Sequence, residues 1–145
     1  MTDIVSLFET YCTNNSIFFS YGRSDYQNLV QSDSIAEKIY LFLDPVTRLK
    51  SFSEFGGNGL ITFSGQFLLL IKGDLDKPYY ETAQAGVSGK YEDNILPLLN
   101  THLQAFEDYL NCTEYQVNQW QILDAINIYD ANMDGLIVTY NLSVL

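Results

Sequence analysis

Basic residues are scarce in this 145-residue sequence, where seven Lys and Arg stand against 18 Asp and Glu, for a net charge of −11. Proteins hold a phosphate backbone with clustered Lys and Arg side chains, and this sequence contains no such cluster. The composition therefore argues against specific nucleic-acid binding. It argues equally against binding to an anionic membrane surface, which attracts basic segments.

Histidine and cysteine are also scarce, which leaves little material for catalysis or metal binding. His102 is the only histidine, and no nucleophile-elbow motif or partner spacing accompanies it. Cys12 and Cys112 lack the spacing of metal ligands, and each follows a helix-like run. We therefore expect His102 at a packing or interface position and both cysteines as small buried hydrophobes. We predict no catalytic residue, no cofactor and no metal site.

Long apolar runs are absent as well. No stretch reaches the length of a transmembrane helix, and the acidic start MTDIVSLFETY has too short an apolar run for a secretory signal. We expect a soluble protein that is made inside the cell.

The residues that are present predict one folded domain over residues 1–145. Apolar residues make up 47% of the chain, with 11 Tyr and nine Phe, and this hydrophobicity is too high for a disordered chain. A glycine-rich turn at 56–59 opens the central strand, which runs to about residue 72 with a two-residue alternation. One parity faces the core and the other is half exposed to water. The predicted core-facing residues are Ile61, Phe63, Phe67, Leu69 and Ile71.

A helix and three further strands are predicted around this segment. The helix begins with Thr2 as its cap, carries an apolar face from Ile4 to Cys12 and ends at 14–15. Short strands are predicted at 17–22 and 38–44, and residues 46–55 form a less regular strand before the glycine turn.

The second half of the chain predicts a longer helix and a closing hairpin. The helix spans 91–110 with Asp93 or Asn94 as its cap, which keeps Pro97 in the first turn; a kinked helix from Ser88 is the alternative. Alternating strands at 119–129 and 136–145 flank a turn at 130–135. The order of elements predicts an α+β fold, with a mostly antiparallel sheet and both helices packed on it.

Two motifs resemble binding sites, but turns explain them better. Asp130, Asn132 and Asp134 match the first half of an EF-hand loop, yet position 141 is asparagine where the closing carboxylate should stand. The glycines at 56–59 precede a strand, whereas a phosphate-binding glycine loop follows a strand and opens a helix. We interpret both segments as turns.

The remaining candidates are carboxylates and loop aromatics. The sequence cannot bring any two carboxylates together, so solvated faces and helix caps are the interpretation we prefer. Tyr79 and Tyr80 lie in a long polar connection at 75–89, and tyrosine is enriched at protein interfaces. For these two tyrosines, a protein contact and simple local packing are weighed equally. The carboxylates considered as an acid/base pair are Asp74, Asp76, Glu81, Glu92, Asp93 and Asp108. The interface candidates are Tyr79, Tyr80, Tyr26, Asp130 and Asp134.

The order of segments resembles the tail-completion or tail-terminator proteins of tailed-bacteriophage necks. The resemblance rests on the amphipathic first helix and on four phrases, IYLFLDPVTR, GLITFSGQFLLLIKGD, YEDNILPLLNTHLQAFEDYL and DGLIVTYNLSVL. The wealth of Tyr, Asn and Phe is also similar to phages of Bacteroidetes hosts, including the crAss-like group. The resemblance spans nearly the whole chain and is one of pattern, without an invariant motif.

This resemblance implies a structural virion protein that forms a homomeric ring at the head-tail neck or tail end. Such a ring contacts itself and neighbouring portal, neck or tail proteins, allows DNA to pass, performs no reaction and is made in the bacterial cytoplasm. An acidic lining of the passage would repel the DNA backbone. The alternative is an acidic inhibitor or adaptor module that binds a basic protein, and an enzyme is the third hypothesis.

Overall fold

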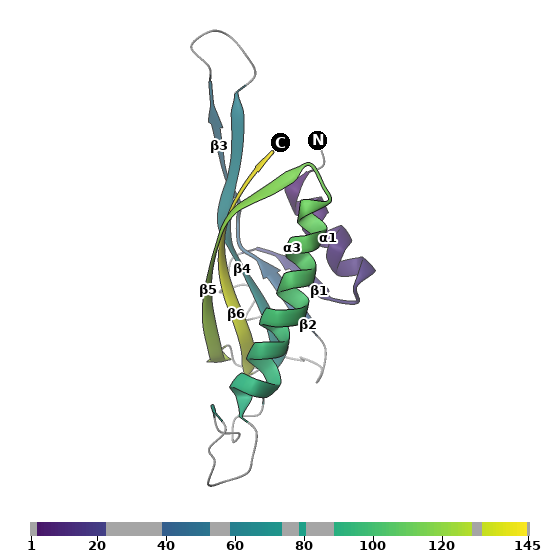
Figure 1. The fold of residues 1–145 in the computed structure, drawn as a ribbon, viewed down its shortest axis with the longest axis vertical. Helices are drawn as coiled ribbons and strands as arrows, with labels where there is room; N and C mark the ends of the chain where they lie inside the picture. The colour runs from purple at the N-terminus through teal and green to yellow at the C-terminus, as the bar shows by residue number, and fades with distance from the viewer. Residues whose placement is uncertain are drawn as a thin grey trace.

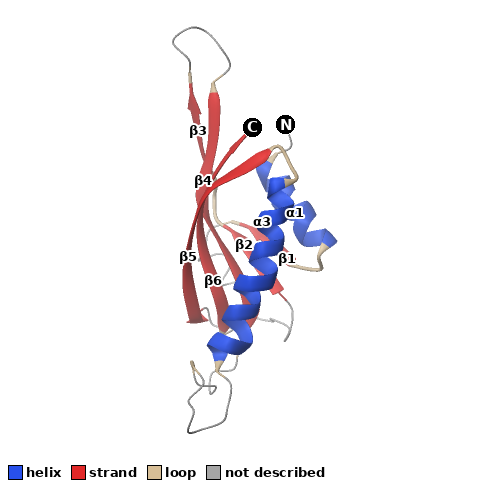
Figure 2. Ribbon diagram, in the orientation of Figure 1, coloured by secondary structure: helices blue, strands red, loops and turns tan. Residues whose placement is uncertain are grey.

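The protein is one mixed six-stranded sheet with helices on one of its faces (Figures 1 and 2). This computed structural model describes residues 3–22, 39–52, 59–73, 79–80, 89–128 and 132–144. The predicted α+β fold is confirmed, with one difference: β1 and β2 pair in parallel, while every other pairing is antiparallel. The strands are β1 (Phe18–Tyr21), β2 (Ile39–Leu43), β3 (Thr47–Ser51), β4 (Leu60–Lys72), β5 (Tyr115–Ile128) and β6 (Met133–Val144).

The central strand is β4, as predicted. The order across the sheet is β1-β2-β4-β6-β5. β3 and β2 pair with the same edge of β4, β3 with its first half and β2 with its second half. The alternation of β4 is confirmed on the helix side, where Phe63, Phe67 and Leu69 are buried. On the other side Leu68 and Leu70 are buried too, because Tyr40 and Phe42 of β2 lie beside them in a second, smaller apolar cluster.

The first helix, α1 (Ile4–Asn14), begins and ends through side-chain hydrogen bonds. Its cap is Asp3 and not Thr2: the Asp3 carboxylate accepts a hydrogen bond of 3.1 Å from the backbone N–H of Ser6. At the other end the Asn15 amide donates to the Tyr11 carbonyl, which supports the predicted end of the helix.

The second helix is continuous from residue 90 to 111 and contains two π-helical stretches. These are η1 (Tyr91–Ile95) and η2 (Leu98–Leu103), and α3 (Gln104–Asn111) completes the helix. The predicted caps Asp93 and Asn94 are wrong, because the first turn precedes them and the Glu92 carboxylate accepts from the Gly89 N–H. Pro97 lies between the π-helical stretches. A proline in a helix has no N–H to donate, and π turns are a common accommodation of such an interruption.

The closing hairpin is confirmed, with a shorter turn than predicted. β6 already begins at Met133, so Asp134 and Gly135 belong to the strand, and Asn132 is the described turn residue in the left-handed region, at φ 55°. Gly135 serves a different purpose there. A side chain at this position would collide with the carbonyl oxygen of Leu69 on β4, so only glycine lets the two strands lie this close.

An aromatic cluster joins the helices to the sheet. Phe67 of β4 lies 5.4 Å from Phe8 of α1, 5.7 Å from Phe106 of α3 and 5.6 Å from Trp120 of β5, measured between ring centroids. The Phe67 and Phe8 side chains are fully buried. One ring of the central strand therefore packs simultaneously against both helices and the neighbouring hairpin.

Truncation of the Phe67 side chain should lower the stability of the fold. We expect Phe67→Ala to lower the free energy of unfolding by about 3–5 kcal/mol, because it removes a fully buried ring and leaves a cavity. Urea denaturation followed by circular dichroism measures the change. Thr101→Ala is the control, since the Thr101 side chain is exposed on the long helix, away from both sheet edges, and its loss should change stability by about 0.5 kcal/mol or less. Equal losses in the two variants would contradict this account of the core.

Candidate assembly interface

The two predicted loop tyrosines are exposed and also packed locally. Tyr79 is 58% exposed and Tyr80 65% exposed. The Asn127 amide donates to the Tyr79 hydroxyl, the Tyr91 N–H donates to the Tyr79 carbonyl at 2.9 Å, and the Tyr80 ring lies 6.0 Å from that of Tyr91. The two tyrosines thus form a fixed aromatic surface beside the start of the long helix. Tyr26 and Asp130 lie outside the described residues.

Asp134, a predicted interface residue, is instead fully buried and paired inside the chain. Its carboxylate lies 3.3 Å from the Lys90 ammonium, which is equally buried and also donates to the side chain of Asn127. The Asn94 amide and the backbone N–H of Asn127 each donate to the same carboxylate at 2.9 Å. Asp134 therefore joins β6, a bulge of β5 and the helix start, and it is not available on the surface.

The acid/base candidates that the structure describes do not converge. Glu92 binds the Gly89 N–H and Asp108 accepts from the Gln104 side chain, as helix caps and solvated faces do, while Asp74, Asp76 and Glu81 lie outside the described residues. His102 is half-buried on η2, where desolvation lowers its pKa. In the described ranges, no three His, Cys, Asp or Glu side chains are grouped so that they could hold a metal ion.

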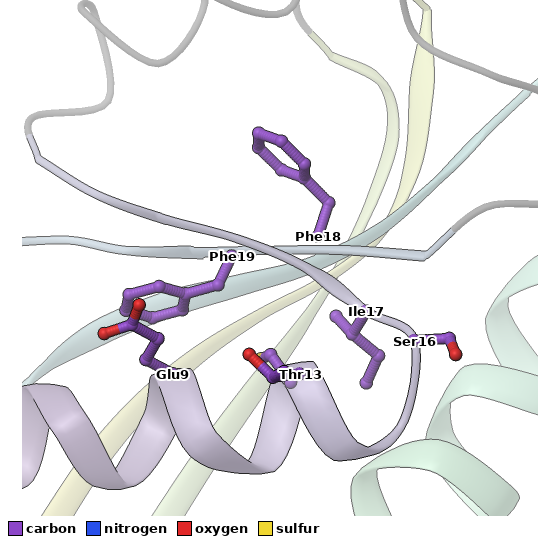
Figure 3. A pocket seen from close by; sticks show the side chains of 7 residues that line it. Glu9, Thr13, Ser16, Ile17, Phe18 and Phe19 are labelled. Atoms are coloured by element: carbon purple, nitrogen blue, oxygen red, sulfur yellow. The ribbon is translucent and has the colours of Figure 1, made fainter.

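A groove of about 560 Å³ lies between α1 and β1 (Figure 3). Its walls carry Glu9, Thr13, Ile17 and Phe19, and its floor includes the Cys12 thiol, whose pKa is raised by burial. A carboxylate beside a thiol that stays protonated supplies no acid/base pair. The groove is a surface feature with one negative charge at its rim.

Three exposed apolar side chains lie on an arm, which we define as β3 and the following Phe52 together with residues 60–64 of β4. In Figure 1 the arm projects beyond the rest of the sheet, and every residue of β3 is exposed. Leu49, Phe52 and Leu60 are 60%, 77% and 57% exposed, respectively. Arg48 and Lys50 flank Leu49 and point to the helix side, in line with Phe63 and Ile61 of β4, and the Lys50 ammonium lies 5.3 Å from the centre of the Phe52 ring. The arm thus combines exposed apolar surface with two of the seven basic residues.

The opposite edge of the sheet is β5, which is also apolar and exposed. Ile122 is 38% exposed and Leu123 62% exposed, and the adjacent Asp124 is exposed on the helix side. In the described part of the chain, β5 pairs only with β6, and β3 only with β4. Unpaired edges of this kind present a row of N–H and C=O groups to any other strand. Sequence reasoning found the alternation of these strands but could not tell which would be edges.

On the sheet face away from the helices, the described side chains of β4, β6 and β5 between Thr62 and Gln121 are uncharged, and one carboxylate reaches them: Asp44, after β2, accepts a hydrogen bond of 2.8 Å from the Gln66 amide. In the register of β4, β6 and β5, hydroxyl and amide side chains form cross-strand rows. The Asn118 amide donates to Asn141 at 2.9 Å, and the Ser143 hydroxyl donates to Asn118 at 3.3 Å. We call this the uncharged face. Its residues are Thr62, Ser64, Gln66, Thr139, Asn141, Ser143, Gln116, Asn118, Gln119 and Gln121.

Among the residues that the structure describes, most acidic side chains belong to the helical layer. α1 and its cap contribute Asp3 and Glu9, and the long helix contributes Glu92, Asp93, Glu107 and Asp108. Charge is therefore divided between the layers, with an acidic helix side, a basic arm and an uncharged face. An acidic lining of any passage would require the helices to face it. No helix in the described ranges has the length and apolar character needed to cross a membrane.

The buried ion pair gives one stability prediction. We expect Lys90→Met to lower the free energy of unfolding by about 3–5 kcal/mol, because it leaves the Asp134 carboxylate buried without its partner charge. The double variant Lys90→Met/Asp134→Asn should recover much of that loss, since neither side chain is then charged. Lys72→Met, at an exposed lysine, is the control and should cost about 1 kcal/mol or less. Chemical denaturation measures all three, and a double variant worse than Lys90→Met would contradict the assignment.

The two cysteines should differ in reactivity. Burial raises the pKa of the Cys12 thiol from 9.0 to about 12, whereas Cys112 is exposed. At pH 8 a thiol reagent should label Cys112 in the native protein and reach Cys12 only after denaturation; rapid labelling of both would contradict the burial. Because the folded protein retains the proton longer, the contribution of Cys12 to the free energy of unfolding should fall as pH rises from about 9 towards 12.

The described surface thus offers four features for recognition: the tyrosine pair, the arm, the β5 edge and the uncharged face. Each is defined by its own geometry in this chain. In comparisons with known proteins, no family model, no curated protein and no solved structure matches the chain.

Proposed function

We propose that this chain is a structural subunit that assembles with copies of itself into a ring, at the neck or tail end of a tailed bacteriophage. The observation that carries the self-assembly is the pair of open apolar edges, β3 and β5, on opposite sides of one sheet. A contact between two different edges is head-to-tail, and such contacts repeat until a ring closes. The phage setting comes from the resemblance of the segment order described above.

Net charge limits how copies of this chain can meet. At −11, two copies repel each other wherever their acidic helical layers approach. The arm is basic, and the exposed part of β5 around Leu123 carries the single carboxylate of Asp124. Contacts between these edges avoid the acidic layer, so the arrangement of charge favours edge-to-edge assembly over helix-to-helix packing.

A ring of this kind would connect neighbouring virion proteins and leave a passage for DNA. The described residues offer no basic cluster that would hold a phosphate backbone, since Lys90 is buried and Arg48 is paired at 3.9 Å with Asp3. The tyrosine pair Tyr79 and Tyr80 is exposed beside the last residues of β5, where Asn127 donates to the Tyr79 hydroxyl, and would be available to adjoining proteins.

The mass in solution tests this proposal. We expect native mass spectrometry or light scattering to find a closed multimer whose population increases with protein concentration. We expect the Leu123→Lys variant to remain monomeric. Lysine on an edge strand opposes pairing with another strand, and Leu123 is exposed enough that the fold should be retained. Thr101→Lys, on an exposed helix position, makes the same change in charge and should leave the multimer intact.

A chain that stays monomeric at every concentration would contradict the ring. If such a monomer bound a basic protein tightly, the alternative of an acidic inhibitor or adaptor module would replace it.

A further inference from the structure

We infer that β3 of one copy pairs antiparallel with β5 of the next copy, with Leu49 opposite Leu123. This inference rests on the proposed ring and specifies the partner strands and their register. Both strands lack a second partner strand among the described residues, and both carry exposed apolar side chains. A strand added to an open edge gains main-chain hydrogen bonds, and the side chains set its register.

The side chains match in this register. Leu49 and Leu123 both belong to the sheet side away from the helices, because Leu49 aligns with Thr62 and Leu123 with Ile137. On the helix side, antiparallel pairing sets Arg48 opposite Asp124 and Lys50 opposite Ile122. The arm's guanidinium then meets the carboxylate of β5, and two exposed leucines cover each other. Opposite charges and apolar pairs at facing positions stabilise neighbouring strands.

The strand directions agree with ring symmetry. β3 runs antiparallel to β4, β4 to β6 and β6 to β5, so β3 and β5 point in opposite directions within one copy. Rotation about a ring axis preserves each strand's direction along that axis. β3 of one copy therefore meets β5 of the next in the antiparallel sense, which the pairing of Arg48 with Asp124 requires.

The register also sets the inclination of the strands. Within one copy, Leu49 is level with Gln116, because both align with the Thr62–Ser143 pair, whereas Leu123 aligns with Ile137, six positions further along β6. Six positions correspond to an offset of about 20 Å along the strands, and four strands span about 19 Å across them. The strands are then inclined by roughly 45° to the ring axis, close to the inclination of strands in closed barrels.

The direction of this inclination assigns the inner face of the ring. β4, the long helix and β5 form a crossover between two parallel strands, and such crossovers are right-handed (Figure 1). The sheet can close into a ring with its helices on the outer or on the inner surface. With a right-handed crossover, the offset from Leu49 to Leu123 inclines the strands to the ring axis in the right-handed sense only if the helices are on the outer surface. Right-handed strand twist inclines barrel strands in this sense. The uncharged face then lines the passage, in place of the acidic lining expected from the net charge.

Disulfide trapping tests the register. In a Cys112→Ser background, Leu49→Cys/Leu123→Cys should form covalent multimers under mild oxidation, because each bond joins one copy to the next. Leu49→Cys/Gln116→Cys is the matched control, since Gln116 is level with Leu49 on one copy and would be its neighbour in a ring without the offset. Cys12 is buried and should not interfere.

Each outcome of the trapping is decisive. Multimers from the Leu123 pair alone support the register, and multimers from the Gln116 pair alone overturn it. If the wild-type chain forms a ring by mass but neither pair is trapped, the β3–β5 contact is overturned while the ring stands. If the wild type remains monomeric, both the register and the proposed function fail.

Charge reversal provides a second, independent measurement. Arg48→Asp and Asp124→Arg should each weaken association roughly tenfold, and the double variant should restore it, because the facing charges are then exchanged at every contact. Lys72→Asp and Asp108→Arg make the same charge changes away from both edges and should leave association unchanged. A double variant as weak as the single variants would overturn the pairing of Arg48 with Asp124.

Discussion

The structure depends on the pairing of β4, because three other strands form their hydrogen bonds with it. β6 pairs with β4 from Thr62 to Lys72, and on the other side β3 and β2 share its length. A shift of one residue would turn Phe67 away from Phe8 and Phe106 and expose the core face. The register of one strand therefore positions both helices, the arm and the edge of the closing hairpin.

The distribution of charge explains why a strongly acidic chain can have an assembly surface at all. In the described residues, most carboxylates lie on the helices, and the one basic surface is the arm, where Arg48 and Lys50 flank the exposed Leu49. The buried pair of Lys90 and Asp134 makes no contribution to this surface. It connects the β5 bulge with the helix start, next to Tyr79, and so keeps the tyrosine pair fixed relative to the sheet.

Local patterns predicted most of the fold but little of the candidate interface. Alternation located β2, β4 and β6, and helical spacing located α1, because each pattern arises from one buried face. The predicted span of the long helix, 91–110, was close, but its cap was wrong because π turns let Pro97 lie deeper than a first turn. Asp134 was predicted in an exposed turn because Asp-Gly is typical of turns. In this structure, Asp134 and Gly135 lie within β6, where it approaches β4 closely. The partner of Asp134, Lys90, is 44 residues away in the sequence, so no local pattern predicts the ion pair. The choice of edge strands depends on the whole sheet topology, so no local pattern predicts the edges either.

The uncharged face should respond little to changes in pH and salt concentration. Amide and hydroxyl side chains neither gain nor lose protons across the physiological range, and the one described carboxylate that reaches these rows is Asp44 at Gln66, so mobile ions have little fixed charge to screen there. The helical layer and the arm change with acidity and ionic strength, whereas the rows from Thr62 to Gln121 keep the same hydrated, neutral character. In the ring that we propose, DNA would pass along a surface whose properties change little with the surrounding medium.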